Sequence, residues 1–143
     1  MQSLDSLQQP TEITRLLQES KSIAVVGLSP KENRPSNMVG RYLITAGYTV
    51  YPVNPGQSEI LGRSCYAELA KITEPIDIVD IFRKSADVLP IVEQLLRLQP
   101  LPRAVWMQQG IINEAAAELA HAKGVMVVMD RCIKVDHQNL LSR

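Results

Sequence analysis

The loop that follows Gly27 carries the residue types of a phosphate-binding site. Ser29 and Ser36 offer hydroxyl groups, and Lys31 and Arg34 offer positive charge. Where a parallel strand gives way to a helix, free backbone N–H groups and the helix dipole favour an anion. The spacing departs from the G-x-G-x-x-G pattern of dinucleotide-binding loops, because only its first glycine is present. The sequence therefore predicts a phosphate loop of another kind; the alternative is a surface turn with solvated charges.

The segment Val53-Asn54-Pro55 closes the next apolar run and is a second candidate. Domains that bind nicotinamide dinucleotides usually place an acidic residue at this point to hold the ribose diol. No acidic residue is present here, which argues against a dehydrogenase. Pro55 sets a turn that could press on an adenine ring. Asn54 is equally typical of a turn without any ligand.

Two glutamines follow the fourth apolar run. Gln108 and Gln109 are uncharged hydrogen-bonding groups on a loop, and loops of this kind often carry binding residues. We therefore expect them, and Gln108 above all, to face a ligand. Trp106, just before them, is better explained as a core residue.

The cysteines Cys65 and Cys132 lie too far apart in sequence to form a metal-ligand motif or a disulfide framework. Cys132 follows the fifth apolar run, at the sheet edge where a ligand should lie. Arg131 and Lys134 would lower the pKa of its thiol if they approach it in space. The alternative is that Cys132 is a small buried apolar residue.

No group of side chains in the sequence is typical of a catalytic or metal site. Asp77 and Asp80 stand three apart in a strand, so they face opposite sides of the sheet and make no acid/base pair. His121 is expected to lie in a helix, either exposed or with its imidazole hydrogen-bonded. His137 has no evident partner in the sequence. Without a nucleophile beside an oriented base, we predict no catalytic residues and no metal ligands.

A sheet is needed to bring these candidates together. Short apolar segments rich in β-branched residues predict strands at 22–26, 49–53, 76–82, 104–107 and 125–129. Helical patterns lie around and between them: 11–20, a helix capped by Ser36 that runs to Ala46, a stripe from Val88 to Leu96, a helix from Asn113 to Gly124, and a short helix after Val135.

This alternation predicts an α/β protein. We expect a Rossmann-like three-layer fold, with a five-stranded parallel sheet in the order 3-2-1-4-5 and helices on both faces. The ligand crevice would lie at the carboxyl ends of strands one and four. Residues 1–143 are expected to form a single domain.

Composition narrows the classes of partner. Fifteen basic residues balance fifteen acidic ones, so the net charge does not favour binding to nucleic acid or to an anionic membrane. No apolar run approaches the ~20 residues that span a bilayer. The polar start of the chain lacks the layout of a signal peptide. These features predict a cytoplasmic protein that binds neither nucleic acid nor membrane.

Several runs together resemble the small stand-alone CoA-binding proteins, a family similar to the amino-terminal CoA-binding domain of succinyl-CoA synthetase alpha subunits. The runs are Ala24-Val-Val-Gly-Leu-Ser29, Gly47-Tyr-Thr-Val-Tyr-Pro-Val-Asn-Pro55, Asp77-Ile-Val-Asp-Ile-Phe-Arg83, Val105-Trp-Met-Gln-Gln-Gly-Ile111 and Asp130-Arg-Cys132. They occur in the same order over roughly Ser20 to Cys132. The resemblance implies a Rossmann-like fold with coenzyme A across the carboxyl ends of the strands.

The resemblance also implies roles for individual positions. It places Gly27 and Ser29 at the pyrophosphate, with Arg34 and Ser36 nearby. It places Val53, Asn54 and Pro55 beside the adenosine, and Phe82 and Arg83 beside the pyrophosphate or the pantetheine arm. Coenzyme A is strongly anionic, so Lys31, Arg34 and Arg83 would compensate its charge.

Three functions are consistent with these features. The favoured one is a non-catalytic module that binds coenzyme A or an acyl-CoA. The second is an NAD(P)-binding oxidoreductase domain. The third is a CoA-binding component of an acyl-CoA ligase, which would need a separate ATP-binding subunit, because residues 1–143 are not expected to include a nucleotide-grasping domain. The expected partners are a small-molecule ligand and either a second copy of the chain or a ligase subunit.

Overall fold

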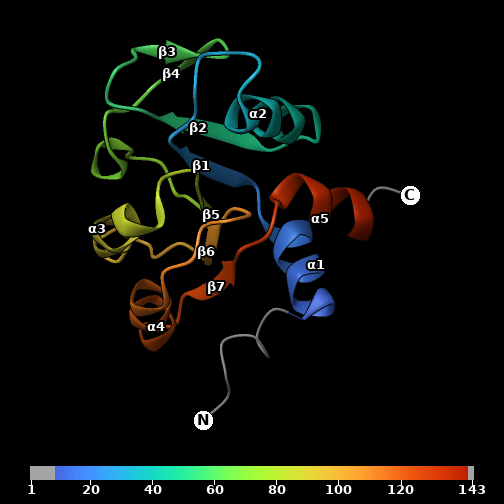
Figure 1. The fold of residues 1–143 in the computed structure, drawn as a ribbon, viewed down its shortest axis with the longest axis vertical. Coiled ribbons are helices and arrows are strands. Elements are labelled where there is room, and N and C mark those ends of the chain that lie inside the picture. The colour runs from blue at the N-terminus through green and yellow to red at the C-terminus, as the bar shows by residue number, and fades with distance from the viewer. Residues whose placement is uncertain (1–8, 142–143) are drawn as a thin grey trace.

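A five-stranded parallel sheet forms the centre of the protein (Figure 1). The structure is a computed structural model that describes residues 9–141. The sheet strands are β1 (Ser22–Val26), β2 (Thr49–Val53), β5 (Ile78–Ile81), β6 (Ala104–Met107) and β7 (Met126–Met129). A separate two-stranded sheet pairs β3 (Glu59–Ile60) with β4 (Arg63–Ser64). The predicted fold class, a Rossmann-like α/β sheet, is confirmed.

The predicted strand order is wrong. The observed order is β2-β1-β5-β6-β7, so the third sheet strand along the chain lies beside the first and not beside the second. The edge of β2 is occupied instead by the segment around Tyr66, which bridges to Val53 and whose N–H donates to the Pro52 carbonyl at 2.9 Å. β5, buried along its whole length, takes the central position between β1 and β6. The chain therefore changes direction across the sheet between β1 and β5, which is where open α/β sheets bind ligands.

Helices cover both faces of the sheet (Figure 1). They are α1 (Pro10–Glu19), α2 (Pro35–Thr45), α3 (Val88–Leu95), α4 (Glu114–Ala122) and α5 (Ile133–Leu140), with short 3-10 turns η2 (Leu69–Lys71) and η3 (Ser85–Asp87). One core cluster joins the sheet to α3 and α4, and a second joins it to α1, α2 and α5. Trp106 is fully buried in the second cluster, as predicted.

Two helix starts differ from the predictions. Ser36 does not cap α2, because the helix already begins at Pro35, which needs no hydrogen-bonding N–H in the first turn. α5 begins at Ile133, earlier than expected. The predicted cap of α4 is confirmed, since the Asn113 side chain accepts from Ala116 N–H at 2.9 Å. Pro90 lies in the first turn of α3, where proline is tolerated.

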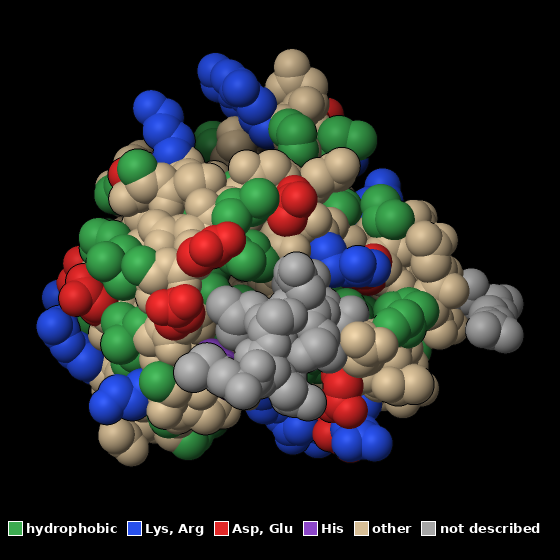
Figure 2. Space-filling model, turned by 60° about the horizontal axis from the view of Figure 1, so that its bottom comes forward, with side chains coloured by type: hydrophobic (Ala, Val, Ile, Leu, Met, Phe, Trp, Pro, Cys, Tyr) green, Lys and Arg blue, Asp and Glu red, His purple; other side chains and the backbone are tan. Residues whose placement is uncertain are grey.

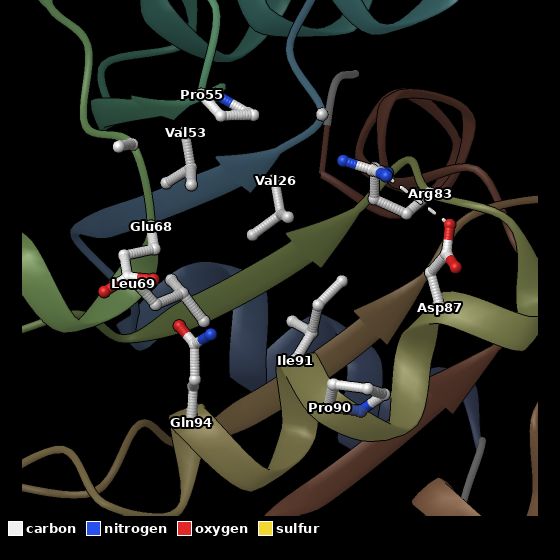
Figure 3. Close-up of a pocket in the computed structure, with 12 residues that line it drawn as sticks. Val26, Val53, Pro55, Glu68, Leu69, Arg83, Asp87, Pro90, Ile91 and Gln94 are labelled. Carbon is white, nitrogen blue, oxygen red and sulfur yellow. Dashed lines mark hydrogen bonds and ion pairs between the residues drawn. The ribbon is translucent and has the colours of Figure 1, made fainter.

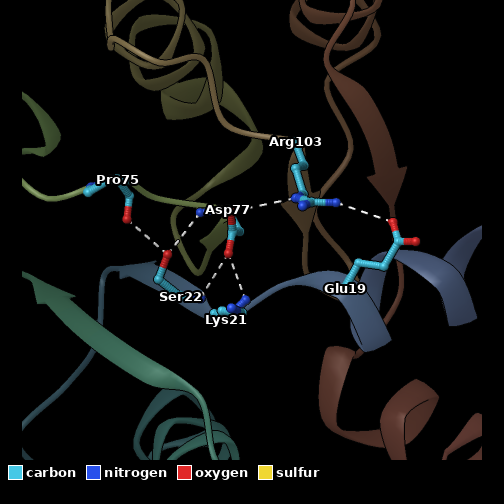
Figure 4. A network of polar contacts seen from close by, with 6 residues as sticks. All are labelled: Glu19, Lys21, Ser22, Pro75, Asp77 and Arg103. Atoms are coloured by element: carbon cyan, nitrogen blue, oxygen red, sulfur yellow. Dashed lines mark hydrogen bonds and ion pairs between the residues drawn. The ribbon is translucent and has the colours of Figure 1, made fainter.

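A polar network ties the amino ends of the strands together (Figure 4). One carboxylate oxygen of Asp77 accepts from the Lys21 and Ser22 N–H groups at 2.6 and 3.2 Å. Arg103 lies 3.6 Å from the other oxygen and 3.2 Å from Glu19. The network links α1, β1 and the segments before β5 and β6, and it lies at the edge opposite the strands' carboxyl ends.

Asp80, unlike Asp77, is buried without polar partners among the described residues. It lies in the middle of β5 between Val25 of β1 and Trp106 of β6, with no exposed surface. Neither carboxyl oxygen has a hydrogen-bond partner among residues 9–141. Burial raises the pKa of Asp80 well above its usual value, because a charged carboxylate is disfavoured where water is excluded.

His137 has a partner that the sequence did not indicate. Its Nδ1 lies 2.6 Å from the Tyr42 hydroxyl, and its ring meets the edges of Tyr42 and Tyr48. Burial lowers the pKa of His137. The contact packs α5 against α2. His121 is exposed, as expected.

The described helices include none with the length and apolar character needed to cross a membrane. On the face in Figure 2, basic and acidic side chains are both present and spread over the surface. This distribution agrees with the balance of fifteen basic and fifteen acidic residues.

Candidate functional site

Gly27 joins the carboxyl ends of three strands. It has a φ of +88°, and a Cβ built there would stand 2.9 Å from the Phe82 carbonyl oxygen. Its N–H donates to the Val53 carbonyl at 2.8 Å. Only glycine fits this conformation and this contact without strain. The ends of β1, β2 and β5 are therefore held together at one point.

The hydroxyls of the loop after Gly27 organise the loop itself. Ser36 Oγ, buried on α2, accepts from Ser29 N–H at 2.9 Å, and Ser29 Oγ accepts from Lys31 N–H at 3.1 Å. The Asn37 amide donates to the Ser29 carbonyl at 2.8 Å. The loop is thus fixed before any ligand arrives.

A cavity of about 470 Å³ lies over this loop. Its lining residues are Gly27, Ser29, Lys31, Arg34, Pro35, Ser36 and Phe82. Lys31 and Arg34 are exposed, and no side chain caps the N-terminus of α2. Two cations and the positive end of a helix dipole thus converge on one space, which suits a phosphate group.

Figure 3 shows a second cavity, of about 320 Å³. Gly27 lines both cavities, so they meet at this residue. The apolar lining of the second cavity comes mainly from Val26, Val53, Leu69 and Ile91. Its remaining lining residues are Gly27, Pro55, Ala67, Glu68, Arg83, Asp87, Pro90 and Gln94. The volume is at the lower end for ligand pockets, ~300–1,000 Å³, so this cavity has room for only part of a larger molecule.

Arg83 is the cation of the second cavity. Its guanidinium lies 3.5 Å from the Asp87 carboxylate, and both side chains are 44% exposed. An exposed pair at this distance contributes little stability, so Arg83 is free to turn toward an anion.

Asn54 lines neither cavity. Its Nδ2 donates to the Leu28 carbonyl at 3.0 Å, and its Oδ1 accepts from Gly56 N–H at 2.8 Å. The side chain therefore forms the turn after β2 and holds it against the segment that follows Gly27. Its contact with adenosine stays a prediction.

Gln108 and Cys132 line neither cavity. Gln108 is buried, and its Oε1 accepts from Ile133 N–H at 3.1 Å, so the amide positions the start of α5. Cys132 is half-buried at the N-cap of α5. Arg131, expected to act on its thiol, instead pairs with Asp136 at 2.7 Å. Contact of Gln108 or Cys132 with a ligand stays a prediction.

The structure brings together nine of the predicted site residues: Gly27, Ser29, Lys31, Arg34, Ser36, Val53, Pro55, Phe82 and Arg83. Their strands are β1, β2 and β5, so the crevice is not at strands one and four as predicted. The sequence analysis missed Glu68, Asp87 and Gln94. Gln94 stands three residues after Ile91 in the predicted helical stripe, and that spacing is the signal that could have found it.

Comparison with known proteins places this geometry in a family. The family model described as "CoA binding domain" matches residues 21–138. The protein YneT of Bacillus subtilis is 44% identical over 126 residues, which cover 88% of this chain and 92% of YneT. The ADP-forming acetate–CoA ligase I of Archaeoglobus fulgidus is 32% identical over 122 residues, which cover 79% of this chain but 18% of the ligase.

Solved structures agree with this assignment. A hypothetical protein from Pyrococcus horikoshii has a TM-score of 0.90 at 37% identity, covering 99% of this chain and 97% of that protein. A Thermus thermophilus protein has a TM-score of 0.88 at 36% identity, covering 94% of this chain and 100% of its own. The chain therefore belongs to the CoA-binding domain family.

Proposed function

We propose that the chain binds coenzyme A or an acyl-CoA as a non-catalytic module. The observation that carries the proposal is the meeting of two cavities at Gly27, one basic and at the N-terminus of α2, the other apolar with Arg83 at its rim. Coenzyme A has a matching layout, because a charged pyrophosphate connects its adenosine to the pantetheine arm. Membership of the CoA-binding domain family supports the same ligand.

In this proposal the pyrophosphate lies over the loop of Ser29, Lys31 and Arg34. The adenine enters the apolar cavity between Pro55 and Ile91, and Arg83 meets a phosphate at the junction of the two cavities. The pantetheine arm then runs along the carboxyl edge of the sheet toward β6 and β7. Gln108 and Cys132 are the groups proposed to meet it.

The first test compares two ligands. Coenzyme A is expected to bind more tightly than NAD, because the end of β2 carries Asn54, already hydrogen-bonded to the protein, in place of an acid for the ribose diol. Isothermal titration calorimetry with both ligands at one salt concentration measures this. Tighter binding of NAD would favour the oxidoreductase alternative and sink the proposal.

The second test concerns Arg83. Its replacement by alanine should weaken coenzyme A binding by roughly 1.5–3 kcal/mol, the scale of a hydrogen bond to a charged group. Arg97→Ala is the matched control, since Arg97 is an exposed cation outside both cavities. Asp87→Asn should preserve or improve the affinity, because it removes a negative charge beside Arg83. Equal affinities of the parent and the Arg83 variant, with both folded, would remove Arg83 from the site.

A second candidate function is a CoA-binding component of an acyl-CoA ligase. The observation that favours it is the 32% identity to the acetate–CoA ligase over 79% of this chain. The ATP-dependent chemistry would then come from another subunit. Copurification with an ATP-binding subunit distinguishes this candidate from a free-standing module.

A further inference from the structure

The apolar cavity has polar side chains at both ends. Figure 3 shows Arg83 and Asp87 at one end, and Glu68 and Gln94 at the other. Glu68 precedes η2, and Gln94 is in the last turn of α3. Arg83 and Asp87 are paired with each other. Among the described residues, the side chains of Glu68 and Gln94 have no hydrogen-bond or ion-pair partner, so their bonding capacity is available to a ligand.

These two groups offer a defined pattern. The Gln94 amide has one acceptor oxygen and an NH₂ donor, whereas an ionised Glu68 carboxylate only accepts. The 6-amino edge of adenine has a donor NH₂ beside an acceptor ring nitrogen, and a glutamine amide pairs with such an edge through two hydrogen bonds. The second amino hydrogen can be accepted by Glu68. A 6-oxo purine presents an acceptor there, which would face the carboxylate.

We propose that Gln94 and Glu68 read the 6-amino edge of the adenine and make the site selective for adenine over a 6-oxo purine. The inference rests on the proposed binding of coenzyme A. Val26, Val53 and Ile91 give the cavity apolar walls, against which a purine ring can pack.

The test measures binding of coenzyme A and of its analogue with hypoxanthine in place of adenine. The parent is expected to prefer coenzyme A by roughly 5- to 150-fold, the range for one well-placed bidentate pair. Gln94→Ala should lose most of that preference. Glu93→Ala is the matched control, because Glu93 is exposed on the same helix and lines neither cavity. It should keep the preference.

Glu68→Gln provides an independent variant at an exposed position. Its new NH₂ group can donate to a 6-oxo oxygen, so the preference should shift toward the hypoxanthine analogue. A parent that binds both ligands equally overturns the inference. So does a folded Gln94→Ala variant that keeps the full preference. Absence of any coenzyme A binding to the parent would instead refute the proposed function, so the two failures are distinguishable.

Discussion

Gly27→Ala is expected to destabilise the protein more than the same change at Gly124. Both glycines have left-handed backbones, with φ of +88° and +85°. A Cβ at position 27 would stand 2.9 Å from the Phe82 carbonyl oxygen, whereas a Cβ at position 124 meets nothing within 4 Å. Alanine at 124 should lower the stability only through its left-handed backbone conformation, by about 1–2 kcal/mol. Alanine at 27 adds displacement of the β5 end, for a total of roughly 2–4 kcal/mol.

Urea unfolding of the parent and the two variants measures this difference. The change at Gly27 should also weaken coenzyme A binding, because it moves the point where the two cavities meet. Gly124 lines neither cavity, so its variant should bind as the parent does. Equal losses of stability at the two positions would mean that the Phe82 contact relaxes without cost.

Asp80→Asn is expected to stabilise the protein at neutral pH, because a neutral amide avoids the free-energy cost of keeping a buried, unpartnered carboxyl from ionising. The pKa of Asp80 is raised in the folded state by burial, so the unfolded chain loses this proton at a lower pH than the folded protein does. Below the ordinary carboxyl pKa of ~3.9, Asp80 is protonated in both the folded and the unfolded state, so its ionisation does not change the free energy of unfolding. As the pH rises above ~3.9, the free energy of unfolding of the parent falls. The fall ends once the pH exceeds the pKa that Asp80 has in the folded protein.

The measurement is the free energy of unfolding of the parent and the variant between pH 4 and 8. Their difference should grow with pH in favour of asparagine, because an amide does not titrate in this range. Other carboxyls contribute equally to both proteins and cancel. A variant that is less stable than the parent by a constant amount across this range would show that the Asp80 carboxyl has a stabilising partner.

The regular elements could be predicted because their signals are local. Residues 22–26 are apolar or small and all five are buried, so the strand follows directly from the run. The predicted third strand was too long, because Ile76 packs into the core before the strand begins at Ile78. That Ser29, Lys31, Arg34 and Ser36 line one cavity could also be predicted, since they lie close together in one loop of the sequence.

The order of the strands could not be predicted, because it depends on a contact between distant segments. Tyr66 lies beyond the turn after β2 and occupies the β2 edge that the predicted order assigned to the third strand. The same limit applies to Glu68 and Gln94. They come from segments more than twenty residues apart, and only the completed fold places them in one cavity.

The central position of β5 has a consequence for the order in which the protein assembles. β1 and β2 leave the ribosome before β5, so the β5-facing edge of β1 stays unpaired until residue 81 has been made. β6 in turn can join the sheet only after β5 has paired with β1, and β7 only after β6. Pairings between strands so far apart in sequence fold slowly, and an unpaired strand edge is open to association with another chain in the meantime. Incomplete chains that end before β5 should therefore aggregate more readily than the finished protein.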